Sequence, residues 1–215
     1  MKALFLDFDG TLVDSLGLLW EIYNRTLRKF GAAGSREEFD RLNGASTEQI
    51  AVALHAAHGF DLRQELFTET FQTGLLNAYR AQVAPFPGTE VFLQEMRKRG
   101  VLLYLVTSAT AAIVQGCLEA NGLWGYFADL ITAEGLISSK PHPAIYERAL
   151  MRAGLGREDA IAIEDAPHGI TAALGAGIPT IAMDWYGSEE MSRPKGVLAR
   201  ARSWEEILVL LPGNS

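Results

Sequence analysis

The chain has 215 residues, of which 48% are hydrophobic and 21% are charged, a composition typical of a folded globular protein. Its formal net charge of −7 argues against sequence-independent nucleic-acid binding, which needs a basic surface. A single cysteine, Cys117, excludes an intrachain disulfide and a thiolate metal cluster. The segment before Asp7 is too short for a signal peptide, and no run approaches the roughly 18 apolar residues of a membrane span. We therefore expect a cytoplasmic protein with no membrane or nucleic-acid partner.

Hydrophobic periodicity, capping pairs and Gly/Pro breaks predict a regular succession of elements. In chain order these are a strand at 3–6; helices at 16–30, from 35, from 46 and at 62–79; and then helix 89–99, strand 101–106, helix 109–121, strand 129–132, helix 143–154, strand 160–163, helix 169–177, strand 178–183 and a helix from 203 to 212. The long strand at 101–106 is continuously apolar, which indicates burial on both faces. Strands separated by helices predict an α/β fold with a doubly wound, Rossmann-like parallel sheet.

Residues 16–82 show no convincing strand pattern. We predict that they form an all-helical domain inserted into the α/β core, called the helical insertion below. The Pro/Gly stretch at 84–88 would return the chain to the core as a stiff connection. The predicted domains are therefore a core of residues 1–15 and 83–215 and a helical insertion of residues 16–82.

Polar residues recur where the predicted strands end. They are Asp7 and Asp9 after the first strand, Thr107 and Ser108 after the second, Lys140 in the loop after the third, and Glu164 and Asp165 after the fourth. Parallel sheets bind ligands outside the carboxyl ends of their strands, so we expect these side chains to converge. Each alone has a plainer explanation, namely a solvated turn, a helix cap or a surface lysine. Their joint occurrence favours a functional site.

The order of these residues resembles the haloacid dehalogenase superfamily of phosphohydrolases, in the subgroup of phosphoglycolate phosphatases and β-phosphoglucomutase. The matching residues are Asp7-Phe-Asp-Gly-Thr-Leu-Val-Asp14, Thr107, Lys140-Pro141, Glu164-Asp165, Gly169 and Ala172-Ala173. These matches lie between residue 2 and about residue 183. The resemblance implies that the helical insertion is a cap placed just after the catalytic nucleophile.

The resemblance also implies a Mg²⁺-dependent phosphatase in which Asp7 attacks phosphorus and forms an aspartyl-phosphate. Asp9 would protonate the leaving oxygen and then deprotonate water, which requires a raised pKa. The expected ligands of Mg²⁺ are the side chains of Asp7 and Asp165 and the backbone carbonyl of Asp9. Glu164 would either bind the ion directly or contact one of its ligands. The sequence therefore predicts a metal-assisted acid and base site on the core.

Substrate contacts are predicted from both parts of the chain. Thr107 and Lys140 would bind the phosphoryl oxygens, and the backbone N–H groups of Gly10 and Ser108 would add neutral donors. Asn43 and Gly44 are the candidates for contact from the helical insertion. The substrate would be a small phosphorylated metabolite such as a sugar phosphate or phosphoglycolate, and the sequence does not determine the oligomeric state.

Competing functions were weighed against single residues. Asp9 argues against a dehalogenase, whose halide leaving group needs no proton, and Lys29 lies outside the loop where a Schiff-base lysine would be expected. A β-phosphoglucomutase-like sugar phosphomutase stays open, although that group carries a histidine where this chain has Leu19. A non-catalytic receiver-like module is disfavoured because its acceptor aspartate does not lie on the first strand. Ala166-Pro167 departs from the family pattern, in which a serine often follows the Glu-Asp pair.

Overall fold

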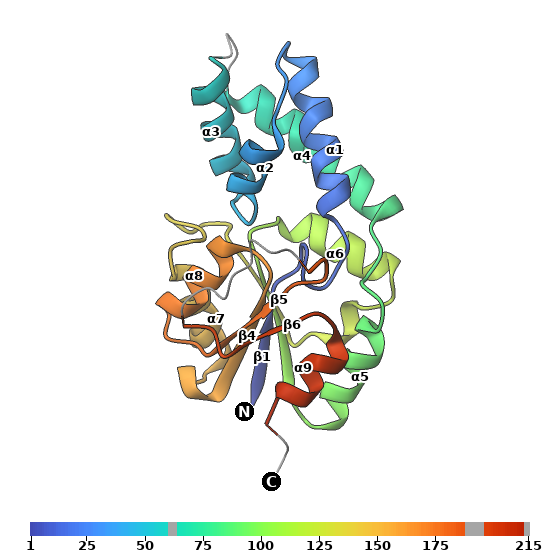
Figure 1. Ribbon diagram of the computed structural model, residues 1–215, viewed down its shortest axis with the longest axis vertical. Coiled ribbons are helices and arrows are strands. Elements are labelled where there is room, and N and C mark those ends of the chain that lie inside the picture. The colour runs from blue at the N-terminus through green and yellow to red at the C-terminus, as the bar shows by residue number, and fades with distance from the viewer. Residues whose placement is uncertain (60–63, 188–195, 213–215) are drawn as a thin grey trace.

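A six-stranded parallel sheet organises the chain in the computed structural model, which describes residues 1–59, 64–187 and 196–212 (Figure 1). The strands are β1 (Ala3–Leu6), β2 (Leu102–Thr107), β3 (Asp129–Thr132), β4 (Ala160–Glu164), β5 (Thr180–Met183) and β6 (Ala199–Ala201). Their order across the sheet is β3-β2-β1-β4-β5-β6, and all neighbours are parallel. The predicted doubly wound α/β fold is confirmed.

Helices connect the strands and cover the sheet. They are α1 (Leu16–Lys29), α2 (Arg36–Leu42), α3 (Thr47–His58), α4 (Gln64–Gln82), α5 (Thr89–Lys98), α6 (Ala111–Ala120), α7 (Ala144–Ala153), α8 (Pro167–Gly175) and α9 (Trp204–Leu210), with single 3₁₀ turns at Trp124–Tyr126 and Arg157–Asp159. None of the helices in the described ranges is both long and apolar enough to cross a membrane.

Strand β1 is buried on both faces because its side chains alternate between two hydrophobic cores. Leu4 and Leu6 pack in the core formed with α5, α6 and α9. Ala3 and Phe5 face the opposite core, formed with α7 and α8. The same burial on both faces was predicted for the apolar run at 101–106, and β2 is buried from Leu103 to Thr107.

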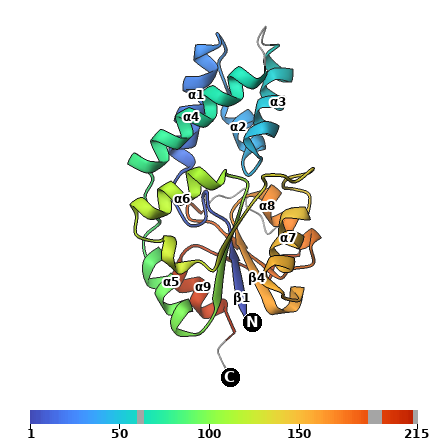
Figure 2. The same ribbon diagram turned by 180° about the vertical axis from the view of Figure 1, so that it is seen from behind.

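Helices α1 to α4 lie beyond the carboxyl-terminal ends of the strands, where both views show them stacked over the sheet (Figures 1 and 2). The Ser35 side chain accepts the Glu38 N–H at the start of α2, and Ser46 and Gln49 form both bonds of a capping box at the start of α3. The predicted starts of these two helices are confirmed. In the described part of residues 16–82 there is no strand.

The chain leaves and re-enters the core side by side. Val13 forms an antiparallel bridge with Pro85, and the Phe86 N–H donates to the carbonyl of Leu12 at 3.1 Å. This pairing lies next to the predicted boundaries at residues 15 and 83. We propose on that ground that residues 16–82 are a separate cap domain.

Several predicted boundaries differ from those observed. The short strand β6, with the sequence Ala-Arg-Ala, was not predicted because three residues carry too little apolar pattern. Helix α6 starts at Ala111 rather than residue 109, since the Ala109 N–H is held by the Thr107 hydroxyl. Pro143 precedes α7 rather than opening it. Residues 62–63 of the predicted fourth helix lie outside the described residues.

Candidate active site

Asp7 lies at the carboxyl end of β1, the strand at the centre of the sheet, and is buried. Its Oδ1 accepts a hydrogen bond from the Lys140 ammonium group at 2.5 Å. Burial raises the pKa of Asp7, and Lys140 opposes this by stabilising the carboxylate. A carboxylate that is desolvated and paired with a cation is a strong candidate nucleophile.

Lys140 is the cation at the base of the site and is only 1% exposed. Its three N–H bonds go to Asp7 Oδ1 at 2.5 Å, Glu164 Oε1 at 2.5 Å and the Val106 carbonyl at 2.9 Å. Burial opposes the charged form, but the two carboxylates outweigh burial and raise the pKa of Lys140. We predicted that Lys140 binds phosphoryl oxygens, and in this structure its donors are committed to protein acceptors instead.

Glu164 and Asp165 extend the acidic cluster from the end of β4. Oxygen atoms of Asp7, Glu164 and Asp165 all lie within 4.8 Å of one another. The Tyr146 hydroxyl donates to Glu164 Oε1 at 2.5 Å, and the Thr11 hydroxyl donates to Asp165 Oδ1 at 3.0 Å. Burial and the neighbouring carboxylates raise the pKa of Glu164 to about 7 and that of Asp165 well above its usual value.

The donor set of this cluster fits a Mg²⁺ ion. Three carboxylates converge with one ammonium group, so their negative charge is incompletely compensated by the protein. Carboxylate oxygens are the hard ligands that Mg²⁺ prefers. Glu164 Oε2 is buried and has no hydrogen-bond partner among the residues that the structure describes. The electrostatics of the cluster therefore favour a bound divalent cation over three closely spaced ionised acids.

Two glycines make room for this cluster. A Cβ at Gly10 would lie 2.2 Å from Asp165 Oδ2, and a Cβ at Gly169 would lie 2.0 Å from Glu164 Oε2. Gly10 also has a φ of +75°, which side-chain-bearing residues rarely adopt. These positions require glycine because carboxylates occupy the space of a side chain.

Asp9 lies apart from the acidic cluster and has different partners. Its Oδ1 accepts hydrogen bonds from the Ser15 hydroxyl at 2.6 Å and from the Tyr79 hydroxyl. Burial raises the pKa of Asp9 to about 6, although both hydroxyl groups stabilise the carboxylate. A carboxyl group with this pKa exchanges a proton readily near neutral pH, which suits acid and base catalysis.

Thr107 and Ser108 border the site at the end of β2. The Thr107 hydroxyl accepts the Ala109 N–H at 3.0 Å, which leaves its own proton available for a ligand. The Ser108 hydroxyl donates to the carbonyl of Gly44 at 2.8 Å and so joins the core to the helical insertion. Neither residue caps α6, whose N-cap is Thr110.

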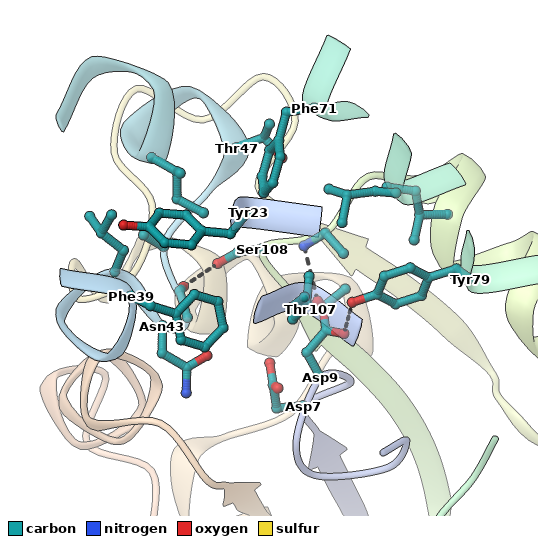
Figure 3. Close-up of a pocket in the computed structure, with 18 residues that line it drawn as sticks. Asp7, Asp9, Tyr23, Phe39, Asn43, Thr47, Phe71, Tyr79, Thr107 and Ser108 are labelled. Carbon is teal, nitrogen blue, oxygen red and sulfur yellow. Dashed lines mark hydrogen bonds between the residues drawn. The ribbon is translucent and has the colours of Figure 1, made fainter. Parts of the chain in front are cut away.

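A pocket lies between Asp7 and the helical insertion (Figure 3). The lining residues that belong to the core are Asp7, Asp9, Thr107, Ser108, Ala109 and Ile113, and those that belong to α1 to α4 and their loops are Leu19, Tyr23, Phe39, Leu42, Asn43, Gly44, Ala45, Thr47, Ile50, Phe71, Leu75 and Tyr79. Figure 3 shows Tyr23 and Phe71 on the side of the pocket away from Asp7, with Tyr79 beside Asp9. Below, the acidic cluster with Lys140 is called the floor, and the lining from the helical insertion is called the roof.

The structure divides the predicted site residues into three groups. Asp7, Asp9, Asn43, Gly44, Thr107 and Ser108 line the pocket. Gly10 and Asp165 line a neighbouring open cleft, whereas Lys140 and Glu164 are buried in the floor. The Gly10 N–H donates to the carbonyl of Val13 at 3.0 Å, so its predicted role as a phosphate donor would require this bond to be exchanged.

Sequence reasoning missed most of the residues that support the site. They are Thr11, Ser15 and Tyr146, which bond to Asp165, Asp9 and Glu164. Ser15 is six residues from Asp9, a separation that offered a weak signal. Tyr146 lies on α7, where its aromatic ring fits the apolar pattern of a helix packed on the sheet. Its hydroxyl group therefore gave no distinguishing signal.

One histidine contributes to the helical insertion. In the helical insertion, behind the roof, His58 Nε2 lies 3.1 Å from both carboxylate oxygens of Glu38. Glu38 also accepts a hydrogen bond from the Tyr23 hydroxyl, and Tyr23 lines the pocket. His58 therefore supports the position of a roof side chain through Glu38.

Residues 4–183 match the family described as haloacid dehalogenase-like hydrolase. The phosphoglycolate phosphatase of Rhodospirillum rubrum is 28% identical to this chain over 207 residues, which cover 92% of the chain and 86% of the relative. Protein CbbY of Cupriavidus necator is 29% identical over 211 residues, which cover 84% of the chain and 77% of the relative.

A solved structure with the same fold is that of CbbY from Rhodobacter sphaeroides in complex with phosphate. Its TM-score is 0.85 at 22% identity, with 96% of each chain covered. A variant of the same protein was solved in complex with xylulose 1,5-bisphosphate and also has a TM-score of 0.85. At this identity the likeness shows the fold.

Proposed function

The chain belongs to the family of haloacid dehalogenase-like hydrolases, and from that premise we propose that it is a Mg²⁺-dependent phosphomonoesterase acting on a small phosphorylated metabolite. Phosphatases among its curated relatives support this class of reaction. The observation that carries the proposal is that two carboxylates have different environments. Asp7 is paired with Lys140, whereas Asp9 is bonded to hydroxyl groups and has a pKa of about 6. A nucleophile and an acid need these different environments.

In the proposed mechanism, Asp7 attacks phosphorus and the bond to the alcohol oxygen breaks as Asp9 donates its proton to that oxygen. The alcohol leaves and an aspartyl-phosphate remains on Asp7. Asp9, now a carboxylate, takes a proton from a water molecule that attacks the phosphorus, which releases inorganic phosphate and restores both side chains. Thr107 has a hydroxyl proton available to bond a phosphoryl oxygen.

Asp7, Glu164 and Asp165 would hold Mg²⁺, together with the backbone carbonyl of Asp9. When bound, the ion supplies positive charge that keeps Asp7 ionised and offsets charge on the phosphoryl group. Lys140 holds the Asp7 carboxylate in place and neutralises part of the cluster. The helical insertion would close over the pocket and exclude bulk water before the phosphoryl group is transferred.

Phosphate release from a panel of phosphomonoesters tests the activity, with sugar phosphates and phosphoglycolate included. We expect release with Mg²⁺ and none in excess EDTA. With 4-nitrophenyl phosphate, whose leaving group needs no proton from Asp9, the Asp9→Asn variant should accumulate the aspartyl-phosphate, because the asparagine cannot activate water, and intact-mass spectrometry should detect one added phosphoryl group. The added group should be absent from the Asp7→Asn, Asp9→Asn double variant. The proposal would be contradicted if none of the esters in the panel released phosphate.

The sugar phosphomutase alternative predicts a different product. Leu19 lines the pocket at the position where that group carries a histidine. Incubation with glucose 1-phosphate, followed by phosphorus NMR, separates the two reactions. Inorganic phosphate is the expected product, whereas conversion to an isomeric sugar phosphate without phosphate release would favour the mutase.

A further inference from the structure

The roof of the pocket is mainly apolar. Its side chains from the helical insertion include Leu19, Phe39, Leu42, Ile50, Phe71 and Leu75. Four aromatic side chains belong to it, because Tyr23 and Tyr79 join Phe39 and Phe71 (Figure 3). The alcohol part of a bound ester would contact these groups once its phosphoryl group lies next to Asp7. Contacts of this kind favour apolar surface on a ligand.

The charged side chains that line the pocket are acidic. Among the described residues that line it, Asp7 and Asp9 are the only charged ones, and none is arginine, lysine or histidine. Lys140 lies beneath Asp7 and donates its protons to protein acceptors. A second carboxylate or phosphate on the alcohol part would therefore lose water without gaining a cation, which is costly.

Three hydroxyl groups of the lining are committed to protein acceptors. The Tyr23 hydroxyl donates to Glu38, the Tyr79 hydroxyl donates to Asp9, and the Ser108 hydroxyl donates to the Gly44 carbonyl. In the roof, Asn43 and Thr47 are the further polar side chains that a leaving group could contact, so additional hydroxyl groups would have to break these bonds or stay poorly paired. The lining therefore selects against many hydroxyl groups as well as against a second anion.

We propose that the preferred substrates are phosphomonoesters of uncharged, mainly apolar alcohols, because the roof joins apolar side chains to a lining without cations. This inference rests on the proposed function, since it places the alcohol of the cleaved ester against the roof. It narrows the broad class of small phosphorylated metabolites, and it ranks phosphoglycolate and sugar bisphosphates below neutral apolar esters.

A matched pair of esters tests the inference on the wild-type protein with Mg²⁺. Benzyl phosphate and 4-carboxybenzyl phosphate have the same reacting atoms and similar leaving alcohols, so their difference reports the added carboxylate. We expect kcat/KM to favour benzyl phosphate by at least about 10-fold, the lower range for discrimination by an apolar pocket. Equal rates, or a preference for the carboxylate, would overturn the inference.

The panel also distinguishes failure of the inference from failure of the proposed function. Hydrolysis of phosphoglycolate or glucose 6-phosphate with no hydrolysis of benzyl phosphate would overturn the apolar preference and leave the phosphatase in place. No release from any ester would overturn both. Each outcome is read from phosphate release under the same conditions.

A charge placed in the roof should reverse the preference. Ile50 on α3 is half-buried and lines the pocket, and Ile50→Arg would supply a cation for the carboxylate of 4-carboxybenzyl phosphate. We expect the ratio of kcat/KM values to shift toward that ester by about 10-fold. Val52→Arg is the matched control, because Val52 is on the same helix, is 52% exposed and does not line the pocket.

A neutral polar variant guards against loss of folding. Ile50→Gln should lower kcat/KM for benzyl phosphate without raising it for the carboxylate, and circular dichroism would verify that each variant is folded. An unchanged ratio in folded Ile50→Arg, or an equal shift in Val52→Arg, would contradict the assignment of the roof to the alcohol part of the substrate.

Discussion

The floor and the roof of the pocket differ in chemistry and in origin. The floor consists of ionisable groups from strand ends and the loop that holds Lys140, which bonds to Asp7, 133 residues away, and to Glu164, 24 residues away. The roof comes from one continuous segment, residues 16–82, and is mainly apolar. On the proposed function, the sheet would supply the reactive groups and the helical insertion the selectivity.

A few hydrogen bonds connect the two regions. The Tyr79 hydroxyl of α4 donates to Asp9, the Ser108 hydroxyl donates to Gly44, and the Ser139 hydroxyl donates to Gln49 Oε1 at 2.6 Å. Gly44 also needs its small size, since a Cβ there would lie 3.1 Å from the Cβ of Ala166 in the loop after β4. Changes to the floor should therefore alter the chemical step. Changes to these hydrogen bonds should alter the pKa of Asp9 or the closure of the pocket.

Loss of the nucleophile should have the largest effect. Asp7→Asn keeps the shape of the side chain but removes the attacking carboxylate, so we expect kcat to fall by about 10⁴-fold or more. Steady-state phosphate release measures the change. The control is Asp14→Asn in the same segment, where the exposed Asp14 accepts a hydrogen bond from the Tyr186 hydroxyl and does not line the pocket. Near-normal activity in Asp7→Asn would end its assignment as the nucleophile.

Loss of the buried ammonium group of Lys140 should have the second-largest effect. Lys140→Met keeps most of the side-chain volume but leaves Asp7 and Glu164 without their shared partner, and breaking a buried pair costs about 3–5 kcal/mol of unfolding free energy. Burial raises the pKa of Glu164 to about 7 and Lys140 opposes the rise, so that pKa rises further in the variant and more unfolding free energy is lost as Glu164 ionises with increasing pH. The loss should therefore be greater at pH 8 than at pH 5, measured by urea unfolding in EDTA.

An exposed lysine provides the comparison for this variant. Lys2 pairs with Asp159 at 3.1 Å, and the Lys2 side chain is 65% exposed. Lys2→Met should change the unfolding free energy by less than about 1 kcal/mol. Equal losses in the two variants would contradict the view that the floor depends on a desolvated ammonium group.

Sequence reasoning succeeded for the floor because parallel sheets bring strand ends together. Asp7, Glu164 and Asp165 follow apolar runs, so their convergence follows from the fold. The supporting bonds could not be read in this way: Tyr79 is 70 residues from Asp9, and Ser139 is 90 residues from Gln49. These contacts depend on how α1 to α4 lie over the sheet, which local patterns do not encode.

The hydrogen bond from Tyr79 of the roof to Asp9 should be detectable in the pH dependence of kcat/KM. Tyr79→Phe removes a donor that stabilises the Asp9 carboxylate, so the pKa of Asp9 should rise above about 6. A hydrogen bond to a charged group corresponds to a shift of roughly 1–2 pH units. The protonated acid then persists to higher pH, and the limb of the kcat/KM profile that reports Asp9 should move upward.

The matched control is another tyrosine of the roof. Tyr23 also lines the pocket, but its hydroxyl donates to Glu38 and not to Asp9. Tyr23→Phe should therefore leave the position of the limb unchanged, even if KM changes. A limb that moves equally in both variants would exclude a specific effect of Tyr79 on Asp9.

The smallest expected effect comes from a bond between the two regions that does not touch the reacting groups. Ser139→Ala removes the hydrogen bond from the loop beside Lys140 to Gln49 of α3, a loss of about 0.5–1.5 kcal/mol. We expect kcat/KM to fall by roughly 2- to 10-fold, because the roof would close less completely over the floor, and the Asp9 limb of the pH profile to stay in place. Ser138→Ala, at the adjacent half-buried position, should have no comparable effect. An unchanged kcat/KM in Ser139→Ala would mean that closure depends on the remaining connections, chiefly the bond from Ser108 to Gly44.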